Sequence, residues 1–141
     1  MNKINVNPYL MFEGNCREAM AFYQSLFGGT LQSMTFGQVD ASCPKAMKDS
    51  IMHSSLITEE LVLLGSDNPE PKPAGSGNIS LALNGTDEQR LTELFRQLSE
   101  GGKIAIPLEK QIWGDLFGVV SDRFGIDWMV NIGSVAAEGQ E

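Results

Sequence analysis

The sequence predicts an α+β fold built from two tandem βαβββ units. A strand-like segment, followed by an amphipathic helix that ends at a Gly-Gly pair, occurs twice, and further strand-like segments follow each helix. The two passages match locally as LMFEGN and LALNGT, which separates Leu10 from Leu81 by 71 residues. The helix-ending glycines, Gly28 and Gly101, are 73 residues apart. The alternative is one irregular domain in which common capping residues recur by chance, and it explains the chain less well.

The first unit is expected to cover residues 1–67 of a single domain that spans residues 1–141. Its opening strand is predicted from Ile4 to Phe12. Asn15 and Glu18 have the spacing of a capping box, and apolar residues at helical spacing follow them. The helix is expected to end at Gly28-Gly29. The remaining strands of this unit are predicted near residues 31–36, 51–58 and 61–64.

The second unit, residues 78–133, repeats this order. It follows a segment rich in Pro, Gly, Ser and Asn that predicts a connector at residues 68–77, and residues 134–141 form a tail. Thr86 and Gln89 have the spacing of a second capping box, and Gly101-Gly102 is expected to end the second helix. The strands of this unit are predicted at residues 78–83, 103–108, 116–121 and 126–132.

The stretch FGVVSDRFGIDWMVNI predicts a β-hairpin whose turn ends at Gly125, a glycine placed to take positive φ. In its second arm, alternation places three residues on each face: Asp127, Met129 and Asn131 against Trp128, Val130 and Ile132. A single helix covers only one face of its sheet. The mixed face therefore meets a second sheet, a partner chain, or a cavity that admits a ligand.

Composition favours an ordinary globular protein. The chain has 141 residues, 42% of them hydrophobic and 20% charged, and needs no disulfide or metal for stability. A net charge of −8 disfavours nucleic acid or an anionic membrane surface as a partner. No apolar run is long enough for a membrane span, and the first residues lack the core of a signal peptide. The two cysteines are too few for a disulfide scaffold, so a reduced cytoplasmic location is expected.

Three blocks carry a family resemblance: NPYLMFEGNCREAMAFYQSLFGG, IMHSSL and WGDLFGVVSDRFGIDWMVNI. With the paired βαβββ units, they resemble the vicinal-oxygen-chelate superfamily of glyoxalase I, extradiol dioxygenases and bleomycin-resistance proteins, and within it the PhnB-like branch. The resemblance covers Pro8 to Ile132. It implies a curved mixed-sheet cup of the glyoxalase/bleomycin-resistance type, in which each unit forms one half and the halves surround a site.

The resemblance also implies where metal ligands would stand in the metal-dependent members. The matching positions in this chain are Pro8, Leu63 or Leu64, Asn78 and Met129. Proline and leucine offer no side-chain donor, and an amide and a thioether are weak ligands for a hard or borderline divalent ion. We therefore expect that the usual metal site is absent, and no cofactor is predicted.

His53 is the single histidine of the chain and the candidate acid or base. Alternation along its strand would place it on one face with Ile51, Ser55 and Ile57. The alternative is a half-buried histidine bonded to the backbone or to a neighbouring serine. Carboxylates for a zinc site around it would have to come from Glu13, Asp115 and Asp127, which is disfavoured.

A second set of residues is predicted to contact a ligand in the cup: Leu10, Phe12, Asn78, Ser80, Trp113, Met129 and Asn131. Leu10 and Phe12 would supply an apolar floor. Trp113 either packs at a strand bend or stacks on a planar or cationic ligand. Amides, a hydroxyl and a thioether suit a small, neutral, partly apolar organic molecule better than a phosphate. Contact with a second sheet would satisfy the same alternation.

Cys16 falls in the first turn of the first helix, where the helix dipole lowers the pKa of a thiol. A catalytic thiol also needs a base beside it, and nothing in the sequence places His53 there. We therefore expect an inert thiol. Cys43 lies in a loop and carries still less signal of reactivity.

Three functional hypotheses follow. The first is a protein that binds a small organic molecule without metal, the second a metal-independent enzyme with His53 as acid or base, and the third a metal-dependent lyase or dioxygenase with displaced ligands. A methyltransferase is disfavoured because no glycine-rich loop for a methyl donor follows a parallel strand. The resemblance also implies a homodimer, and the cup would be formed within one chain or across two.

Overall fold

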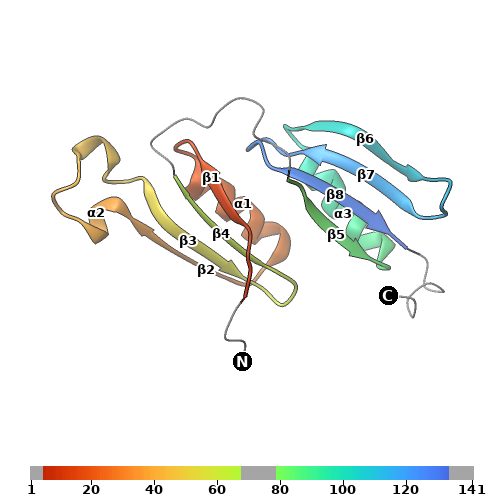
Figure 1. Ribbon diagram of the computed structural model, residues 1–141, viewed down its shortest axis with the longest axis horizontal. Helices are drawn as coiled ribbons and strands as arrows, with labels where there is room; N and C mark the ends of the chain where they lie inside the picture. The colour runs from red at the N-terminus through yellow and green to blue at the C-terminus, as the bar shows by residue number, and fades with distance from the viewer. Residues whose placement is uncertain (1–4, 68–78, 134–141) are drawn as a thin grey trace. The chain divides into compact units, whose positions relative to one another are not determined.

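The computed structural model describes residues 5–67 and 79–133. The chain divides into two compact units, residues 1–72 and 73–141, and each is described by itself. Each unit contains one four-stranded mixed sheet and one 12-residue helix (Figure 1). The predicted α+β fold with two repeated βαβββ-like units is therefore confirmed. Among the described residues, no helix is long and apolar enough to cross a membrane.

Unit 1 has the strand order β1-β4-β3-β2, in which β1 and β4 are parallel and the other neighbours antiparallel. Its elements are β1 (Tyr9–Phe12), α1 (Cys16–Phe27), β2 (Thr30–Thr35), α2 (Phe36–Val39), η1 (Lys45–Met47), β3 (Ile51–Ile57) and β4 (Val62–Asp67). The short helices α2 and η1 were not predicted. The opening strand begins at Tyr9 and not at Ile4, and the fourth strand extends three residues past the predicted end at Leu64.

Helix α1 begins after Asn15, as predicted, but the predicted capping box does not form because Asn15 makes no side-chain cap. The buried carboxylate of Asp67 satisfies this end of the helix instead. Its Oδ1 accepts the backbone N–H groups of Gly14 and Cys16, both at 2.9 Å. Its Oδ2 accepts the N–H of Ile51 at 2.8 Å. One side chain at the end of β4 thus fixes the starts of α1 and β3.

Unit 2 has the strand order β5-β8-β7-β6, with β5 and β8 parallel. Its elements are β5 (Leu81–Gly85), α3 (Glu88–Ser99), β6 (Lys103–Lys110), β7 (Leu116–Ser121) and β8 (Asp127–Ile132). The predicted capping box at Thr86 is wrong by one residue, because the side chain of Asp87 accepts the N–H of Arg90 and caps α3.

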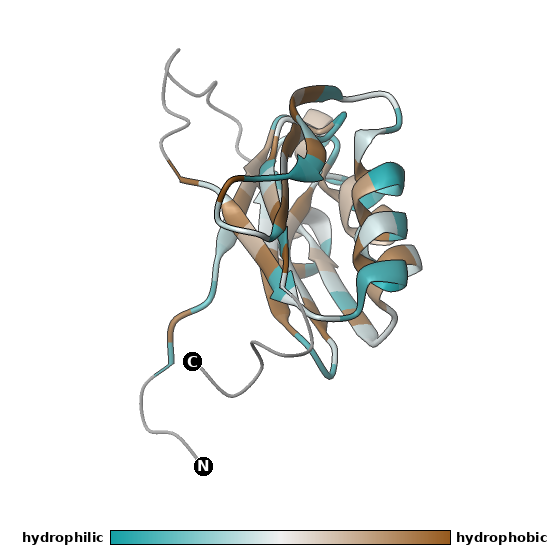
Figure 2. Ribbon diagram, turned by 90° about the vertical axis from the view of Figure 1, so that its right-hand side faces the viewer, coloured by the Kyte–Doolittle hydropathy of each residue, from teal (hydrophilic) through white to brown (hydrophobic). Residues whose placement is uncertain are grey.

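The helix of each unit covers one face of its sheet. Hydrophilic residues colour the outer side of the helical turns in Figure 2, and hydrophobic residues run along the strands. In β8 the predicted alternation is confirmed by the burial of every second residue: Trp128, Val130 and Ile132. Gly125 has a φ of 87°, as predicted for the turn before β8. Within residues 5–67 and 79–133, the 12-residue helix of each unit leaves the opposite face of its sheet uncovered, and we call this face the open face.

Candidate functional site

The open face of unit 1 is defined by alternation in β1. Leu10 and Phe12 are buried, whereas Tyr9 is 45% exposed and lies on the open face. Because residues paired across strands share a face, the register carries this face across the sheet. One row of open-face residues therefore includes a side chain from every strand: Tyr9, Leu64, Ser55 and Gln32.

A β-bulge decides where His53 points. The neighbouring residues Met34 and Thr35 of β2 face opposite sides of the sheet. Met34 pairs with His53 of β3, and Thr35 pairs with Ile51. Ile51 therefore lies on the helix side, where it is only 1% exposed, and His53 lies on the open face. The prediction that Ile51 shares the face of His53 was wrong, because the bulge inserts one extra residue between them.

The imidazole of His53 is held by Tyr9. A hydrogen bond of 3.1 Å joins the Tyr9 hydroxyl and His53 Nδ1, and the two ring centroids are 5.8 Å apart. Strand β4 lies between β1 and β3, so the tyrosine reaches diagonally across it. Within residues 5–67 and 79–133, Tyr9 is the one hydrogen-bond partner recorded for the ring. The contact fixes the ring and directs Nε2 away from Tyr9.

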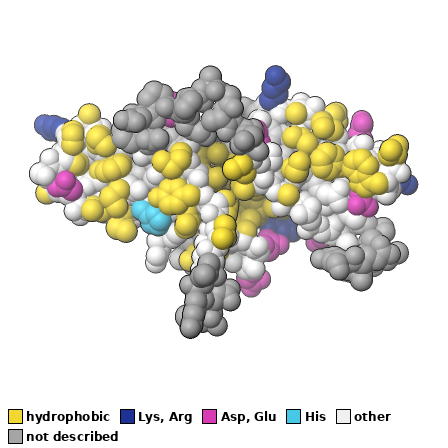
Figure 3. All heavy atoms as spheres, in the orientation of Figure 1, with side chains coloured by type: hydrophobic (Ala, Val, Ile, Leu, Met, Phe, Trp, Pro, Cys, Tyr) yellow, Lys and Arg dark blue, Asp and Glu magenta, His cyan; other side chains and the backbone are white. Residues whose placement is uncertain are grey.

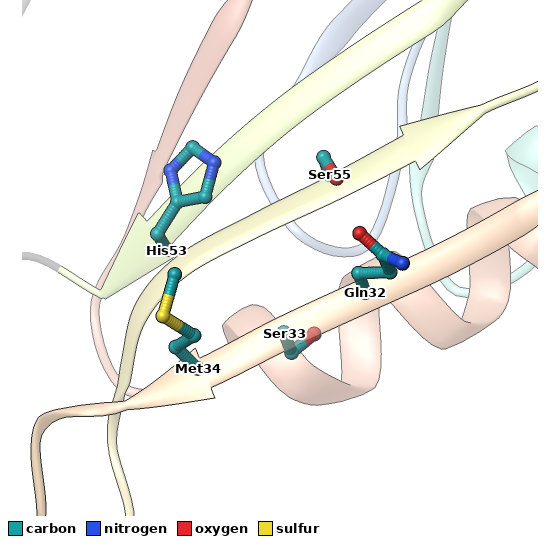
Figure 4. A pocket seen from close by; sticks show the side chains of 5 residues that line it. All are labelled: Gln32, Ser33, Met34, His53 and Ser55. Atoms are coloured by element: carbon teal, nitrogen blue, oxygen red, sulfur yellow. The ribbon is translucent and has the colours of Figure 1, made fainter. Parts of the chain in front are cut away.

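A hollow of about 370 Å³ lies beside this histidine. It is lined by Gln32, Ser33, Met34, His53 and Ser55. Figure 4 shows that these residues come from the adjacent strands β2 and β3. The volume is at the lower end of the about 300–1,000 Å³ typical of small-molecule pockets. In Figure 3 the imidazole, drawn in cyan, reaches the surface beside hydrophobic side chains.

Other groups around the hollow are neutral. The Ser33 hydroxyl is bonded to that of Ser54 at 3.0 Å, which turns it towards the helix side. The Ser66 hydroxyl donates to the Met11 sulfur at 3.7 Å. The lining of the hollow therefore combines a thioether with an amide, hydroxyls and an imidazole, and it contains no carboxylate, lysine or arginine.

In unit 2, three of the predicted contact residues lie on or beside the open face. Met129 pairs with Ala82, and Asn131 pairs with Asn84 and Phe117. Ser80 is exposed and stands two residues before Ala82, just outside β5. The amide of Asn131 donates to Asp115 Oδ2 at 3.0 Å, so a carboxylate reaches this face as well.

Trp113 lies in the turn between β6 and β7 and is 58% exposed. Its ring meets that of Phe117 edge-on, with centroids 5.8 Å apart. Phe117 belongs to the open face through its pairing with Asn131. The tryptophan therefore extends the open face of unit 2 with an accessible aromatic surface.

The two residues predicted to form an apolar floor, Leu10 and Phe12, do not lie on the open face. Leu10 and Phe12 are 8% and 2% exposed and face α1, and the side chains of Phe12 and Met20 both lie close to Gly65. They belong to the core of unit 1, and Tyr9 and Met11 occupy the open face of β1 in their place. Asn78 lies outside the described residues.

The positions matched to metal ligands in the resemblance carry weak donors or none. Pro8 contributes a backbone carbonyl that accepts the N–H of Leu64 at 3.1 Å. Leu64 and Met129 lie on the open faces of their own units. In the described part of the chain, no group of three or more His, Cys, Asp and Glu side chains is placed to hold a metal ion.

Cys16 is buried and fully covered, with an exposed fraction of 0%. Burial raises the pKa of its thiol from 9.0 to about 12, and the nearby Asp67 carboxylate adds to this increase. The dipole of α1, which would lower the pKa, is outweighed because Asp67 occupies the N–H groups at the helix start. This environment agrees with the predicted inert thiol.

In native protein at pH 8, we expect a disulfide reagent such as 5,5′-dithiobis(2-nitrobenzoate) to label Cys43 and leave Cys16 unmodified. Cys43 is partly exposed, whereas the Cys16 thiol stays protonated until the pH approaches about 12. Mass spectrometry of the labelled chain gives the site. Denatured protein, in which both thiols react, is the control. Rapid native labelling of Cys16 would contradict the assignment.

A family described as 3-demethylubiquinone-9 3-methyltransferase matches residues 4–131. The chain belongs to this family. The predicted PhnB-like branch is thereby supported, since a solved member from Bacillus cereus is described as a putative 3-demethylubiquinone-9 3-methyltransferase, PhnB protein. That structure is 23% identical, with a TM-score of 0.78 over 92% of this chain and 100% of its own.

Two relatives of this PhnB-like chain are nearer in sequence. Protein YjdN of Escherichia coli is 31% identical over 90% of this chain and 94% of its own length. Protein PA1353 of Pseudomonas aeruginosa is 40% identical over 94% of this chain and 99% of its own, with a TM-score of 0.81. More distant structures share the fold alone. The fosfomycin resistance protein FosX of Listeria monocytogenes is 12% identical over 99% of this chain and 100% of its own, with a TM-score of 0.62.

Proposed function

We propose that this PhnB-like protein binds a small, partly apolar organic molecule on the open face of unit 1. The observation that carries the proposal is the His53 imidazole, fixed by Tyr9 at 3.1 Å beside a hollow of about 370 Å³. A ring that is already oriented loses little conformational freedom when a ligand binds. The ligand would bond to Nε2 and lay its apolar part against Met34.

The uncharged lining of the hollow selects against anionic ligands. An anion that binds here loses its hydration, and this desolvation costs free energy. The lining offers an imidazole, an amide and hydroxyls, but no lysine or arginine to balance the negative charge. The net charge of −8 opposes its approach further. A neutral donor group, such as an amine, an amide or a hydroxyl, matches Nε2 without this cost.

The turn before α1 does not support methyl transfer, the activity in the family's name. A methyl-donor nucleotide needs free backbone N–H groups at a glycine-rich strand-to-helix turn. Here the N–H groups of Gly14 and Cys16 already bond to the buried carboxylate of Asp67. A binding function of the open face places no demand on that turn.

A second candidate is a metal-independent enzyme, and the Tyr9–His53 contact favours it specifically. When Nδ1 donates to the Tyr9 oxygen, Nε2 has a free lone pair and can accept a proton from a bound molecule. When Tyr9 donates to Nδ1, Nε2 carries the proton and can return it. The same contact therefore serves binding and acid–base chemistry, and Tyr9 acts as the positioning residue.

The binding proposal is tested with N-phenyl-1-naphthylamine, a neutral apolar amine whose fluorescence rises when it leaves water. Saturable binding to the native protein is expected. In the His53→Ala variant the affinity should fall about tenfold, equivalent to about 1.4 kcal/mol. His53→Gln, which keeps a hydrogen-bonding group, should lose less. The measurement is a fluorescence titration at constant protein concentration.

Ser25→Ala is the matched control, because Ser25 is an exposed polar residue on α1, on the other side of the sheet. Its affinity should equal that of the native protein. Equal affinities in the His53→Ala and Ser25→Ala variants would remove the open face of unit 1 as the binding site. Turnover of any substrate that survives in His53→Ala would end the acid–base candidate.

We propose further that binding needs no metal ion. The support is the chemistry of the positions that the resemblance assigns to ligands: Pro8 and Leu64 lack a side-chain donor, and Met129 has only a thioether. Dialysis against a chelator should leave the affinity for N-phenyl-1-naphthylamine unchanged. A metal content near one ion per chain, lost together with binding, would refute this part of the proposal.

A further inference from the structure

The turn between β6 and β7 carries an accessible tryptophan close to two carboxylates. Trp113 contacts Phe117 edge-on, and in this arrangement one of the two rings keeps its faces free of the other. The turn is ordered by two backbone bonds, from Gln111 N to the Asp115 carbonyl at 2.8 Å and from Gly114 N to the Gln111 carbonyl at 2.9 Å. The backbone of the turn that carries Trp113 is therefore ordered.

The first carboxylate belongs to Asp115. Its Oδ2 accepts the Asn131 amide at 3.0 Å, which brings it to the row of open-face residues that contains Phe117. Among the described residues, Asn131 is the one hydrogen-bond partner recorded for this side chain, and no ion pair neutralises its charge. The negative charge is thus held in place beside the aromatic pair.

The second carboxylate belongs to Glu109, which pairs directly with Phe117 and so lies on the same face. Lysines are placed elsewhere. Lys110 pairs with Leu116, on the opposite face of the sheet. Lys103 pairs with Ser121, four residues from Phe117, which is about 13 Å along a strand. The surroundings of Trp113 are therefore negative, in agreement with the overall charge of the chain.

An aromatic face beside carboxylates is the arrangement that attracts organic cations. The ring quadrupole and the carboxylate charges act in the same direction on a cation, and each contribution grows as water is excluded. Hydrophobic side chains gather over β6, β7 and β8 in Figure 3, which adds apolar contact for a planar ligand. The sequence analysis left a planar or a cationic ligand open for Trp113, and the register adds the carboxylates of Asp115 and Glu109 to the same face.

We infer that the cluster of Trp113, Phe117, Asp115 and Glu109 binds a planar organic cation, such as an N-alkylated aromatic heterocycle. The inference goes beyond the proposed function, because it adds a second site, on unit 2, for a different class of ligand. The cation stacks on Trp113 while the Asp115 and Glu109 carboxylates balance its charge.

The test uses N-methylquinolinium as the probe and quinoline as its neutral analogue of nearly the same shape. Trp113 is 58% exposed and Trp128 only 1%, so quenching of tryptophan fluorescence reports on Trp113. Saturable quenching by N-methylquinolinium at pH 7.5 is expected, with at least tenfold weaker binding of quinoline. Asp115→Asn, which can still accept the Asn131 amide, should weaken cation binding several-fold and leave quinoline unaffected.

Glu93→Gln is the matched control, since it removes one exposed carboxylate from α3 of the same unit. It should bind the cation like the native protein. Quenching that never saturates, or equal loss in the Asp115→Asn and Glu93→Gln variants, would overturn the inference. His53→Ala should leave cation binding intact while it weakens binding of N-phenyl-1-naphthylamine. The two probes therefore test the unit 1 proposal and this inference independently.

Discussion

Replacement of Asp67 with alanine is expected to lower the free energy of unfolding by about 3 kcal/mol, because it leaves buried N–H groups without acceptors. The Asp67 side chain is 6% exposed and accepts three backbone N–H groups from the starts of α1 and β3. Water cannot easily replace a carboxylate at this depth. The loss should be visible as a lower midpoint in urea unfolding followed by circular dichroism.

Asp67→Asn gives a graded version of the same experiment. The two bonds to Gly14 and Cys16 share Oδ1, whereas Ile51 bonds to Oδ2. An asparagine oxygen can keep the first two, but its NH₂ group would then face the N–H of Ile51. We expect about half the loss of the alanine variant.

Glu13→Ala is the control for the Asp67 variants, because Glu13 is an exposed carboxylate of the same unit. A loss in Asp67→Ala no greater than in this control would contradict the assigned role. Ile51 stands two residues before His53 and next to the bulge. Asp67→Asn should therefore also weaken binding of N-phenyl-1-naphthylamine while the protein remains folded.

The elements that the sequence predicted well are those with strong local signals. The helix that ends at Gly28 and the alternation of β8 depend on periodicity and on glycine, which are read within a few residues. The end of β4 was missed for the opposite reason. Ser66 and Asp67 are typical turn residues, so the predicted strand ended before them, at Leu64. The segment is a strand because Ser66 and Asp67 pair with Met11 and Phe12 of β1, a contact between residues that are distant in sequence.

The sequence predicted the candidate site only in part, because some of its contacts join residues that are distant in sequence. His53 was identified because it is the single histidine on a predicted strand. Its partner Tyr9 was missed, since the contact spans 44 positions in sequence and crosses β4. Leu10 was chosen in place of Tyr9 because the short strand β1 does not reveal its buried face by pattern alone. The bulge beside His53 likewise has no signal in the sequence.

Replacement of Asp122 with alanine is expected to lower the free energy of unfolding by about 3 kcal/mol for the same physical reason as in unit 1. Asp122 is 3% exposed. Its Oδ1 accepts the N–H groups of Phe124 and Ile126 at 2.9 and 3.1 Å, and its Oδ2 accepts the Trp128 indole N–H at 3.0 Å. One carboxylate thus closes the turn before β8 and satisfies the largest buried side chain of the unit.

The bond to Trp128 can be isolated by a double-mutant cycle. Asp122→Asn can keep the turn bonds to Oδ1 while presenting NH₂ to the indole, so it should cost about 1–2 kcal/mol in the native background. In a Trp128→Phe background the indole N–H is gone, and the same substitution should cost little. The coupling between the two sites is then the difference between these costs.

Both tryptophans of the chain belong to unit 2, so tryptophan fluorescence follows this cycle without a signal from unit 1. Glu93→Ala, an exposed carboxylate of α3, is the control for loss of charge. Equal costs of Asp122→Asn in the two backgrounds would contradict the indole contact. Strand β8 carries Met129 and Asn131 on its open face. Loss of the bond that holds Trp128 should therefore also weaken N-methylquinolinium binding, since the same strand joins the buried face to the proposed cation site.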